Sequence, residues 1–184
     1  DRGDQRCVNC EIIEDGEGDT NAMLLLQGMM EVLGYDVDAG KIKIVGESFS
    51  GGWKSGHAKN IMEQILTAND NNVDEVLSEN DGMAGGVVAA LSAQGLVIPV
   101  GGQDGDLAAI NRVARGTQTV SVWKDARDLG KAAGEIASAL AAGTSMDAIK
   151  GATKFSGGEK GIAINAILLD PTPLTRDNLS IAID

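Results

Sequence analysis

The sequence predicts an α/β fold in which an open parallel sheet carries helices on both faces. Five short apolar runs suitable for strands alternate with stretches suitable for helices, and the connections between them are short. Glycine is frequent, with 25 residues among 184, and much of it falls where a strand run passes into a helix. Strict alternation favours parallel strands joined by right-handed crossovers. The predicted strands are residues 8–14, 41–46, 73–78, 96–101 and 117–123.

The helices are predicted from the spacing of apolar residues. From Ala58 these residues recur at intervals of three and four, as on a helix with one buried face. Residues 23–33 are rich in Leu and Met, and Gly34 after them suits a helix C-cap. The predicted helices are residues 23–33, 58–66, 82–93, 107–114 and 126–140.

The pattern changes after Gly143. Residues 156–160 suit a loop, residues 162–169 a strand, and residues 170–173, with two prolines, a rigid break. Residues 181–183 suit a short final strand. A chain of this length is enough for one good core but not for two full-sized domains, so we expect one principal domain.

The charge of the chain argues against two classes of partner. Its net charge is -12, and its Lys and Arg residues are scattered singly or in pairs. Such a surface repels nucleic acid and anionic membranes. No apolar stretch reaches the ~18 residues of a membrane span, and no signal peptide opens the chain. Because the chain begins at Asp1 without Met, we expect a processed protein or a fragment.

No catalytic, metal or cofactor motif is found. Cys7 and Cys10 do not open a helix, and His57 is the single histidine, so a zinc site would lack ligands. We expect a local disulfide or unreactive thiols. Residues 16–18 lack the third glycine of a dinucleotide-binding loop, and nucleophile-elbow and phosphate-loop motifs are absent. The sequence therefore predicts a protein that is not an enzyme and needs no cofactor.

A polar cluster follows each predicted strand. Ligands of open parallel sheets bind at the carboxyl ends of the strands, so these clusters should face one edge of the sheet. Carboxylates and amides can each engage neighbouring hydroxyl groups, an indole packs on the C–H face of a sugar ring, and an ammonium can donate to its oxygens. The sequence thus predicts a site for a small polyhydroxylated molecule. The candidate ligand-binding residues are Asp19, Asn21, Trp53, Asn80, Asp104 and Lys124.

Each candidate also has an ordinary structural explanation. Asp19 and Asp104 suit helix N-caps, which are common at a turn from strand to helix. Trp53 suits a loop anchor, and Lys124 suits a solvated lysine.

A phosphoreceiver domain is a further alternative. It has the same order of strands and helices, with acidic residues after the first strand and a lysine after the fifth. The residues that could imitate its site are Glu14, Asp15, Asp81 and Lys124. Its phosphoacceptor should end the third strand, however, and here Asn80 holds that place with Asp81 after it.

Much of the chain resembles the D-xylose-binding proteins of bacterial sugar transporters. The likeness runs in one register from about Asp19 to Lys124 and includes the polar clusters. The chain departs from the usual pattern of that family at three places. Thr20 stands where the family usually has Asn, Asp125 stands where it often has Pro, and the pair Cys7 and Cys10 has no counterpart in it. The resembling segments are residues 19–22, 40–46, 52–53, 69–72, 80–86, 90–96, 102–104 and 116–119.

This resemblance implies a class I periplasmic binding protein, whose two lobes close around a sugar and deliver it to a membrane permease. It implies a monosaccharide ligand, D-xylose or another pentose, bound by the six candidate residues, and a periplasmic or extracytoplasmic location. It also implies that a first lobe is missing before Asp1. Residues 1–124 would form the sugar-binding lobe, residues 125–161 would recross to the other lobe, and residues 162–184 would form a terminal strand and return. A sugar-sensing module that signals to a regulatory partner is the alternative.

Overall fold

The computed structural model describes residues 7–16, 18–156 and 160–183, and the chain forms two compact units. Unit 1 consists of Asp1–Trp123 with Pro173–Asp184, and unit 2 of Lys124–Thr172. The predicted α/β fold class is confirmed, since strands and helices alternate through unit 1 in the expected order.

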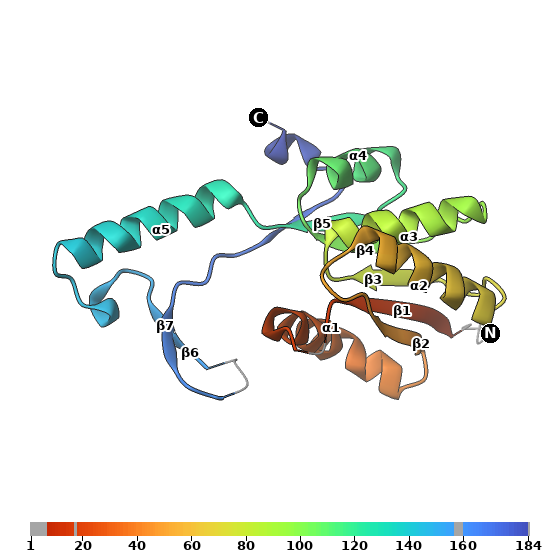
Figure 1. Cartoon of the computed structure of the whole chain (residues 1–184), viewed down its shortest axis with the longest axis horizontal. Coiled ribbons are helices and arrows are strands. Elements are labelled where there is room, and N and C mark those ends of the chain that lie inside the picture. Colours follow the sequence, from red (N-terminus) through yellow and green to blue (C-terminus); the bar gives the residue numbers. More distant parts are fainter. Residues whose placement is uncertain (1–6, 17, 157–159, 184) are drawn as a thin grey trace, which may run out of the picture. The chain divides into compact units, whose positions relative to one another are not determined.

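Unit 1 is built on a six-stranded sheet (Figure 1). Its strands are β1 (Val8–Glu14), β2 (Ile42–Phe49), β3 (Glu75–Ser78), β4 (Val100–Asp104), β5 (Val120–Trp123) and β8 (Thr172–Leu174). Their order across the sheet is β2-β1-β3-β4-β5-β8, and the pairs from β2 to β5 are parallel. The carboxyl ends of β1 to β5 therefore lie along one edge of the sheet, which we call the rim.

Helices cover both faces of this sheet. They are α1 (Thr20–Asp38), α2 (Ser55–Ala68), α3 (Asp81–Ala93) and α4 (Leu107–Arg115). Helices α2 and α3 pack against each other on one face, and α1 lies on the opposite face (Figure 1). The crossovers explain this, because the step from β1 to β2 runs in the opposite direction to the steps from β2 to β3 and from β3 to β4. Right-handed connections then place α1 on the other side.

The main hydrophobic cluster lies between the sheet, α2 and α3. Side chains alternate between the two faces of a strand, and Ile13 of β1 points into this cluster. Met62 of α2 and Met83 of α3 are fully buried there. The two helices approach closely at Gly86, where a Cβ atom would overlap with the carbonyl oxygen of Ser55.

A carboxyl group is buried within unit 1. Glu11 of β1 is 0% exposed, and a Cβ atom at Gly46 would overlap with its carboxyl group and crowd Ile65 of α2. Burial raises the pKa of Glu11 to about 7. The Ser48 hydroxyl, which lies outside strict hydrogen-bond geometry, opposes this rise, and the Glu47 carboxylate adds to it. Between about pH 4.5 and 7, the folded chain thus keeps a proton on Glu11 that the unfolded chain releases.

Glu11 makes the stability of the protein depend on pH. Because the pKa of Glu11 is raised, the stability that its protonated form contributes is fully present below about pH 4.5 and is lost as the pH rises through about 7. Glu11→Gln stays neutral, so it should raise the free energy of unfolding by about 3 kcal/mol at pH 8 and by less than about 1 kcal/mol at pH 5. Urea denaturation at both pH values measures this. The exposed Glu31, changed to Gln, is the control, and an equal gain at both pH values would contradict the prediction.

The structure confirms the predicted order of elements, but several strands and helices begin or end at other residues than predicted. The predicted strand at residues 8–14 agrees with β1, whereas β4 begins only at Val100, directly after Pro99, which has no N–H to donate to a neighbouring strand. Helix α1 continues through Gly34 to Asp38, so Gly34 is not its C-cap. The N–H of Ala39 instead closes the helix by donating to the carbonyl oxygen of Tyr35 at 3.0 Å.

Two predictions near the C-terminus are wrong. Thr172 and Pro173, predicted within a rigid break, belong to β8, and proline is tolerated there because β8 is an edge strand. Residues 181–183 do not form a strand, since the short 3-10 helix η2 (Leu179–Ala182) occupies this region. Its Leu179 packs in a second apolar cluster with Val113 of α4.

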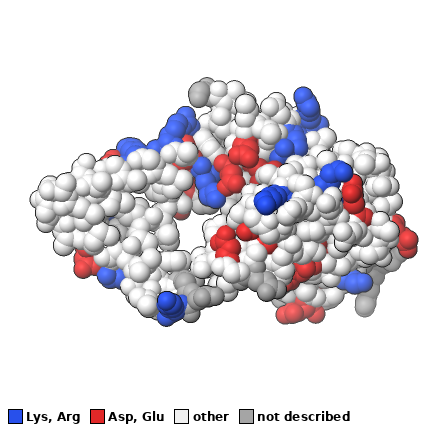
Figure 2. All heavy atoms as spheres, viewed as in Figure 1, with Lys and Arg blue, Asp and Glu red and all other residues white. Residues whose placement is uncertain are grey.

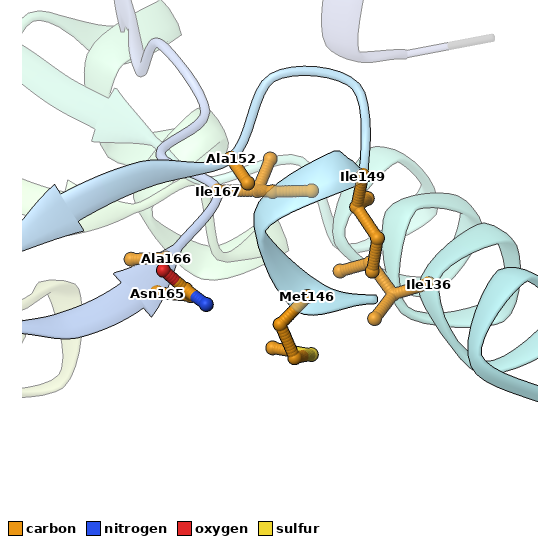
Figure 3. A pocket seen from close by; sticks show the side chains of 7 residues that line it. All are labelled: Ile136, Met146, Ile149, Ala152, Asn165, Ala166 and Ile167. Atoms are coloured by element: carbon orange, nitrogen blue, oxygen red, sulfur yellow. The ribbon is translucent and has the colours of Figure 1, made fainter. Parts of the chain in front are cut away.

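Unit 2 contains α5 (Ala126–Ala141), the 3-10 helix η1 (Met146–Ala148) and a hairpin of β6 (Thr153–Phe155) with β7 (Ile164–Ala166). The predicted strand at residues 162–169 is thus shorter than expected. Of the predicted loop at 156–160, residues 157–159 lie outside the described residues. A cavity of about 40 Å³ within unit 2 is mainly apolar (Figure 3). Its lining residues are Ile136, Met146, Ile149, Ala152, Asn165, Ala166 and Ile167.

The two cysteines are free thiols, so the disulfide alternative is wrong. Residues three positions apart in an extended chain point to opposite sides, which keeps Cys7 and Cys10 apart. Burial, followed by the charge of Glu75, raises the pKa of Cys10 to about 12. A thiol this far from ionising is unreactive.

The described helices are all too short or too polar to span a bilayer. On the face drawn in Figure 2, Lys and Arg side chains lie singly or in small groups among acidic ones. This mixed surface agrees with the scattered basic residues of the sequence.

Candidate functional site

Four of the predicted ligand-binding residues lie in the loops at the rim of unit 1. Asp19 follows β1, Trp53 follows β2, Asn80 follows β3, and Asp104 is the last residue of β4. We call these four residues the rim site. Because β2, β1, β3 and β4 are consecutive neighbours in the sheet, their loops are neighbours too.

Asp19 has two roles. As the N-cap of α1, its Oδ1 accepts the backbone N–H of Asn21 at 2.8 Å, and its Oδ2 accepts the indole Nε1–H of Trp53 at 3.2 Å. The N-cap explanation for Asp19 is therefore confirmed, and the same carboxylate also orients the indole. Asn21 lies exposed in the first turn of α1.

Trp53 sits in an unusual turn before α2. Gly51 and Gly52 have φ angles of 64° and 83°, and Trp53 itself has φ 58°, a region that bulky residues avoid. Asp15 supports this turn, since its Oδ1 accepts the backbone N–H of Trp53 and its carbonyl oxygen accepts the N–H of Gly51 at 3.3 Å. Trp53 is half-buried against the main hydrophobic cluster. It is therefore a loop anchor that keeps part of its indole exposed at the rim.

Asn80 is the N-cap of α3. Its Oδ1 accepts the backbone N–H of Met83 at 2.8 Å, which leaves its Nδ2 amino group as a donor. The neighbouring Gly82 lies beside both loops, because a Cβ atom there would be 3.5 Å from both the carbonyl oxygen of Trp53 and Oδ1 of Asn80. The amide and the tryptophan loop thus share one part of the rim.

Asp104 has a positive φ of 111° at the end of β4. Gly105 after it packs against the indole of Trp123, which would overlap with any side chain added there. The N-cap position of α4 is Asp106, so the N-cap explanation for Asp104 is wrong. Burial raises the pKa of Asp106, and the nearby Asp81 and Asp104 carboxylates add to this.

Asp81 holds the loop that follows β4. It is 1% exposed, and its Oδ2 accepts the N–H groups of Gly105 at 2.9 Å and Asp106 at 3.0 Å and the hydroxyl of Ser121 at 2.6 Å. Its Oδ1 accepts Nε2 of Gln118 at 2.8 Å. The two oxygens of one buried carboxylate thus fix the backbone next to the rim site.

Arg112 of α4 completes this network. It donates from Nη2 to the carbonyl oxygen of Asp81 at 2.7 Å and from Nε to Oε1 of Gln118 at 2.9 Å. Burial lowers the pKa of Arg112, while the charges of Asp81 and Asp106 act in the opposite direction. Arg112 therefore offsets part of the negative charge gathered behind the rim.

The phosphoreceiver alternative depends on Asp81 as the phosphoacceptor. Because this side chain is buried and both of its oxygens accept hydrogen bonds, it does not face a phosphodonor in solution. The structure therefore argues against that alternative.

Lys124 follows β5, is exposed, and is the first residue of unit 2. Its contact with a ligand, like that of Asn21, remains a prediction. Among the described residues, no three His, Cys, Asp or Glu side chains are grouped as a metal ion would require.

The rim site combines three kinds of interaction. Asp19 and Asp104 supply carboxylate acceptors, Asn80 supplies an amide donor, and Trp53 supplies an aromatic face. A hydroxyl group both donates and accepts, so this set suits a molecule with several neighbouring hydroxyls. Hydrogen bonds to charged groups are worth about 1.5–3 kcal/mol each, so a few of them would decide which ligand binds.

Sequence reasoning missed the residues that support the rim site. Asp15 and Asp81 were considered only for phosphoryl transfer, and Glu79 was not considered. Glu79 is 1% exposed, and its Oε2 accepts the backbone N–H of Asp15 at 3.0 Å. The sequence did contain a signal for these residues. Each is a carboxylate directly or shortly after a predicted buried strand, at a position where the side chain is still inside the protein.

Comparison with known proteins places the chain in a family. A family model described as a periplasmic binding protein domain matches residues 2–145. The D-xylose-binding periplasmic protein of Escherichia coli (strain K12) is 44% identical over 163 residues, which are 88% of this chain and 48% of that protein. The corresponding protein of Haemophilus influenzae is 42% identical over 164 residues, again 88% and 48%. The chain thus spans about half the length of the curated relatives it matches.

Solved structures agree with this assignment. An ABC transporter solute-binding protein from Clostridium phytofermentans, with bound β-D-glucose, is 26% identical with a TM-score of 0.83, covering 98% of this chain and 58% of that one. A Caulobacter myo-inositol-binding protein at 22% identity has a TM-score of 0.73 over 95% of this chain and 54% of that one, and supports the fold alone. Together with the family match, these findings show that the chain belongs to the periplasmic binding protein domain family.

Proposed function

We propose that the chain is a sugar-binding lobe of a solute-binding protein, which binds a monosaccharide without changing it chemically and supplies it to an ABC transporter. The observation that carries this proposal is the rim site, where the Trp53 indole is hydrogen-bonded to Asp19 beside Asn80. An aromatic face next to carboxylate and amide groups suits a sugar ring. The proposal requires no cofactor.

D-xylose is the sugar that the relatives support best. Two proteins at 44% and 42% identity are named as D-xylose-binding, and a more distant relative from Azospirillum brasilense, at 30% identity, is named as binding multiple sugars. A pentose is therefore the proposed ligand, and Asn21 and Lys124 are further residues predicted to bind it.

The relatives also suggest partners and a location. Because the chain spans about half of their length, a second lobe would complete the site, and a membrane permease would receive the sugar. The relatives are periplasmic, so we place this chain outside the cytoplasm. A site that keeps about half of a micromolar binding free energy retains about -4 kcal/mol, which corresponds to millimolar affinity.

Titration of the chain with D-xylose tests this function. We expect saturable heat release in the millimolar range and weaker responses to arabinose, ribose and glucose. Trp53→Ala and Asp104→Ala should each weaken binding at least about tenfold, since each removes a principal contact. Calorimetry suits all variants, because it does not depend on tryptophan fluorescence.

Asp38→Ala is the matched control for Asp104→Ala. Asp38 is exposed at the end of α1 that lies away from the rim, so its loss should leave the affinity unchanged. Equal weakening by both substitutions, or no heat from any sugar up to tens of millimolar, would refute the proposal.

A further inference from the structure

The carboxyl groups of Glu79 and Asp15 hold the Trp53 turn in place through hydrogen bonds to the backbone. Oε2 of Glu79 accepts the backbone N–H of Asp15 at 3.0 Å, and Oδ1 of Asp15 accepts the backbone N–H of Trp53. The indole of Trp53 then donates to Asp19 at 3.2 Å. A continuous series of contacts therefore runs from Glu79, through Asp15 and Trp53, to Asp19.

Glu79 differs from the other acidic groups at the rim. It is 1% exposed, and its Oε1 is buried with no hydrogen-bond partner among the described residues. Burial raises the pKa of Glu79 to about 7. The hydrogen bond from Asp15 opposes this rise, and the charges of Glu14, Asp15 and Asp19 add to it. Glu79 therefore gains or loses its proton near neutral pH, close to other carboxylates.

The charge of Glu79 bears on the position of the indole. In the neutral form, one oxygen accepts the Asp15 N–H without adding a charge. In the ionised form, a negative charge repels the carboxylates of Asp15 and Asp19, and these two carboxylates hold the backbone and the indole of Trp53. Trp53 has an unfavourable φ of 58°, so its position depends on these bonds.

We propose that Glu79, acting through Asp15, is a positioning residue for the Trp53 indole, and that its neutral form holds the indole where a sugar ring packs. The part of this inference that concerns sugar rests on the proposed function, whereas the position of the indole is a property of the free protein. A bound sugar removes water from the rim, which further disfavours a charged Glu79. Sugar affinity should therefore fall as the pH rises from 6 to 8.5.

The first test needs no sugar. In ¹⁵N-labelled chain, the indole N–H resonance of Trp53, assigned by its loss in Trp53→Phe, is followed from pH 5.5 to 8.5. We expect its chemical shift to titrate with a midpoint near 7 in the unaltered chain and to stay flat in Glu79→Gln. Glu11→Gln is the matched control, because it removes another buried glutamate whose pKa is about 7 but which lies outside this series of contacts. This control should keep the midpoint.

The second test measures D-xylose affinity over the same pH range. We expect Kd to rise about fivefold from pH 6 to 8.5 in the unaltered chain and in Glu11→Gln, and to stay constant in Glu79→Gln. An indole resonance that titrates while no sugar binds at any pH would support the positioning role and refute the proposed function. A flat resonance in the unaltered chain, or a midpoint retained in Glu79→Gln, would overturn the inference. If Glu79→Gln does not fold, a flat resonance in the unaltered chain still overturns the inference.

Discussion

Asp81→Ala should lower the free energy of unfolding by about 4 kcal/mol. The substitution removes a buried carboxylate that accepts four hydrogen bonds, and it leaves Nε2 of Gln118 and the hydroxyl of Ser121 without that acceptor inside the protein. A hydrogen bond to a charged group contributes about 1.5–3 kcal/mol, and an unsatisfied buried donor costs about 1–3 kcal/mol. Arg112 would also lose a neighbouring negative charge.

Urea denaturation followed by circular dichroism measures this loss. Asp38→Ala is again the control, since it removes an exposed carboxylate from the same unit and should change stability by less than about 0.5 kcal/mol. In Asp81→Ala the loop after β4 also loses its anchor, so any chain that remains folded should bind sugar as weakly as Asp104→Ala does. Stability within about 1 kcal/mol of the unaltered chain would show that Gln118 and Ser121 find other partners.

Gly86→Ala should destabilise the protein by about 3 kcal/mol, although alanine is the better helix former. The added Cβ atom would overlap with the carbonyl oxygen of Ser55 and lie 2.9 Å from the backbone nitrogen of Lys59. These are backbone atoms at the start of α2, so a side-chain rotation cannot relieve the clash. The helices must separate, and forcing extra volume into a packed core costs about 1–3 kcal/mol or more.

Gly28→Ala provides a control with the opposite sign. Gly28 lies in the middle of α1, and a Cβ atom there would have nothing within 4 Å. The same substitution should therefore stabilise the chain by about 0.5–1 kcal/mol through helix propensity alone. Thermal denaturation of the two variants side by side tests the difference, and a gain in stability from both would contradict close packing between α2 and α3.

The order of strands and helices could be predicted because it depends on local patterns. The apolar spacing from Ala58 identified α2, and the run from Val8 to Glu14 agrees with β1. Ends of elements were harder to predict, because they depend on tertiary context. Gly34 suits a helix end locally, yet α1 continues past it to Asp38. Local preference at one glycine is worth at most about 1 kcal/mol, which packing along the helix readily outweighs.

The supporting network of the site could not be predicted, since its contacts join distant parts of the chain. Asp81 and Gln118 are 37 positions apart, and Asp15 and Glu79 are 64 positions apart. The rim residues themselves were accessible to sequence reasoning, because they follow strands. For Asp19, a helix cap and a ligand-binding residue were treated as alternatives, although one side chain can be both, and for Asn80 a helix cap was not predicted at all. Each caps a helix and also lies among the rim residues, since the loops that end parallel strands are the loops that begin helices.

The packing of Glu11 against Gly46 restricts the order in which these two positions can evolve. Any side chain at position 46 meets the buried carboxyl group and the end of the Ile65 side chain, so such a change requires these side chains to shift or position 11 to become smaller. Shortening Glu11 first leaves a cavity, whereas enlarging Gly46 first produces a clash. The two positions are expected to vary together among descendants of this chain.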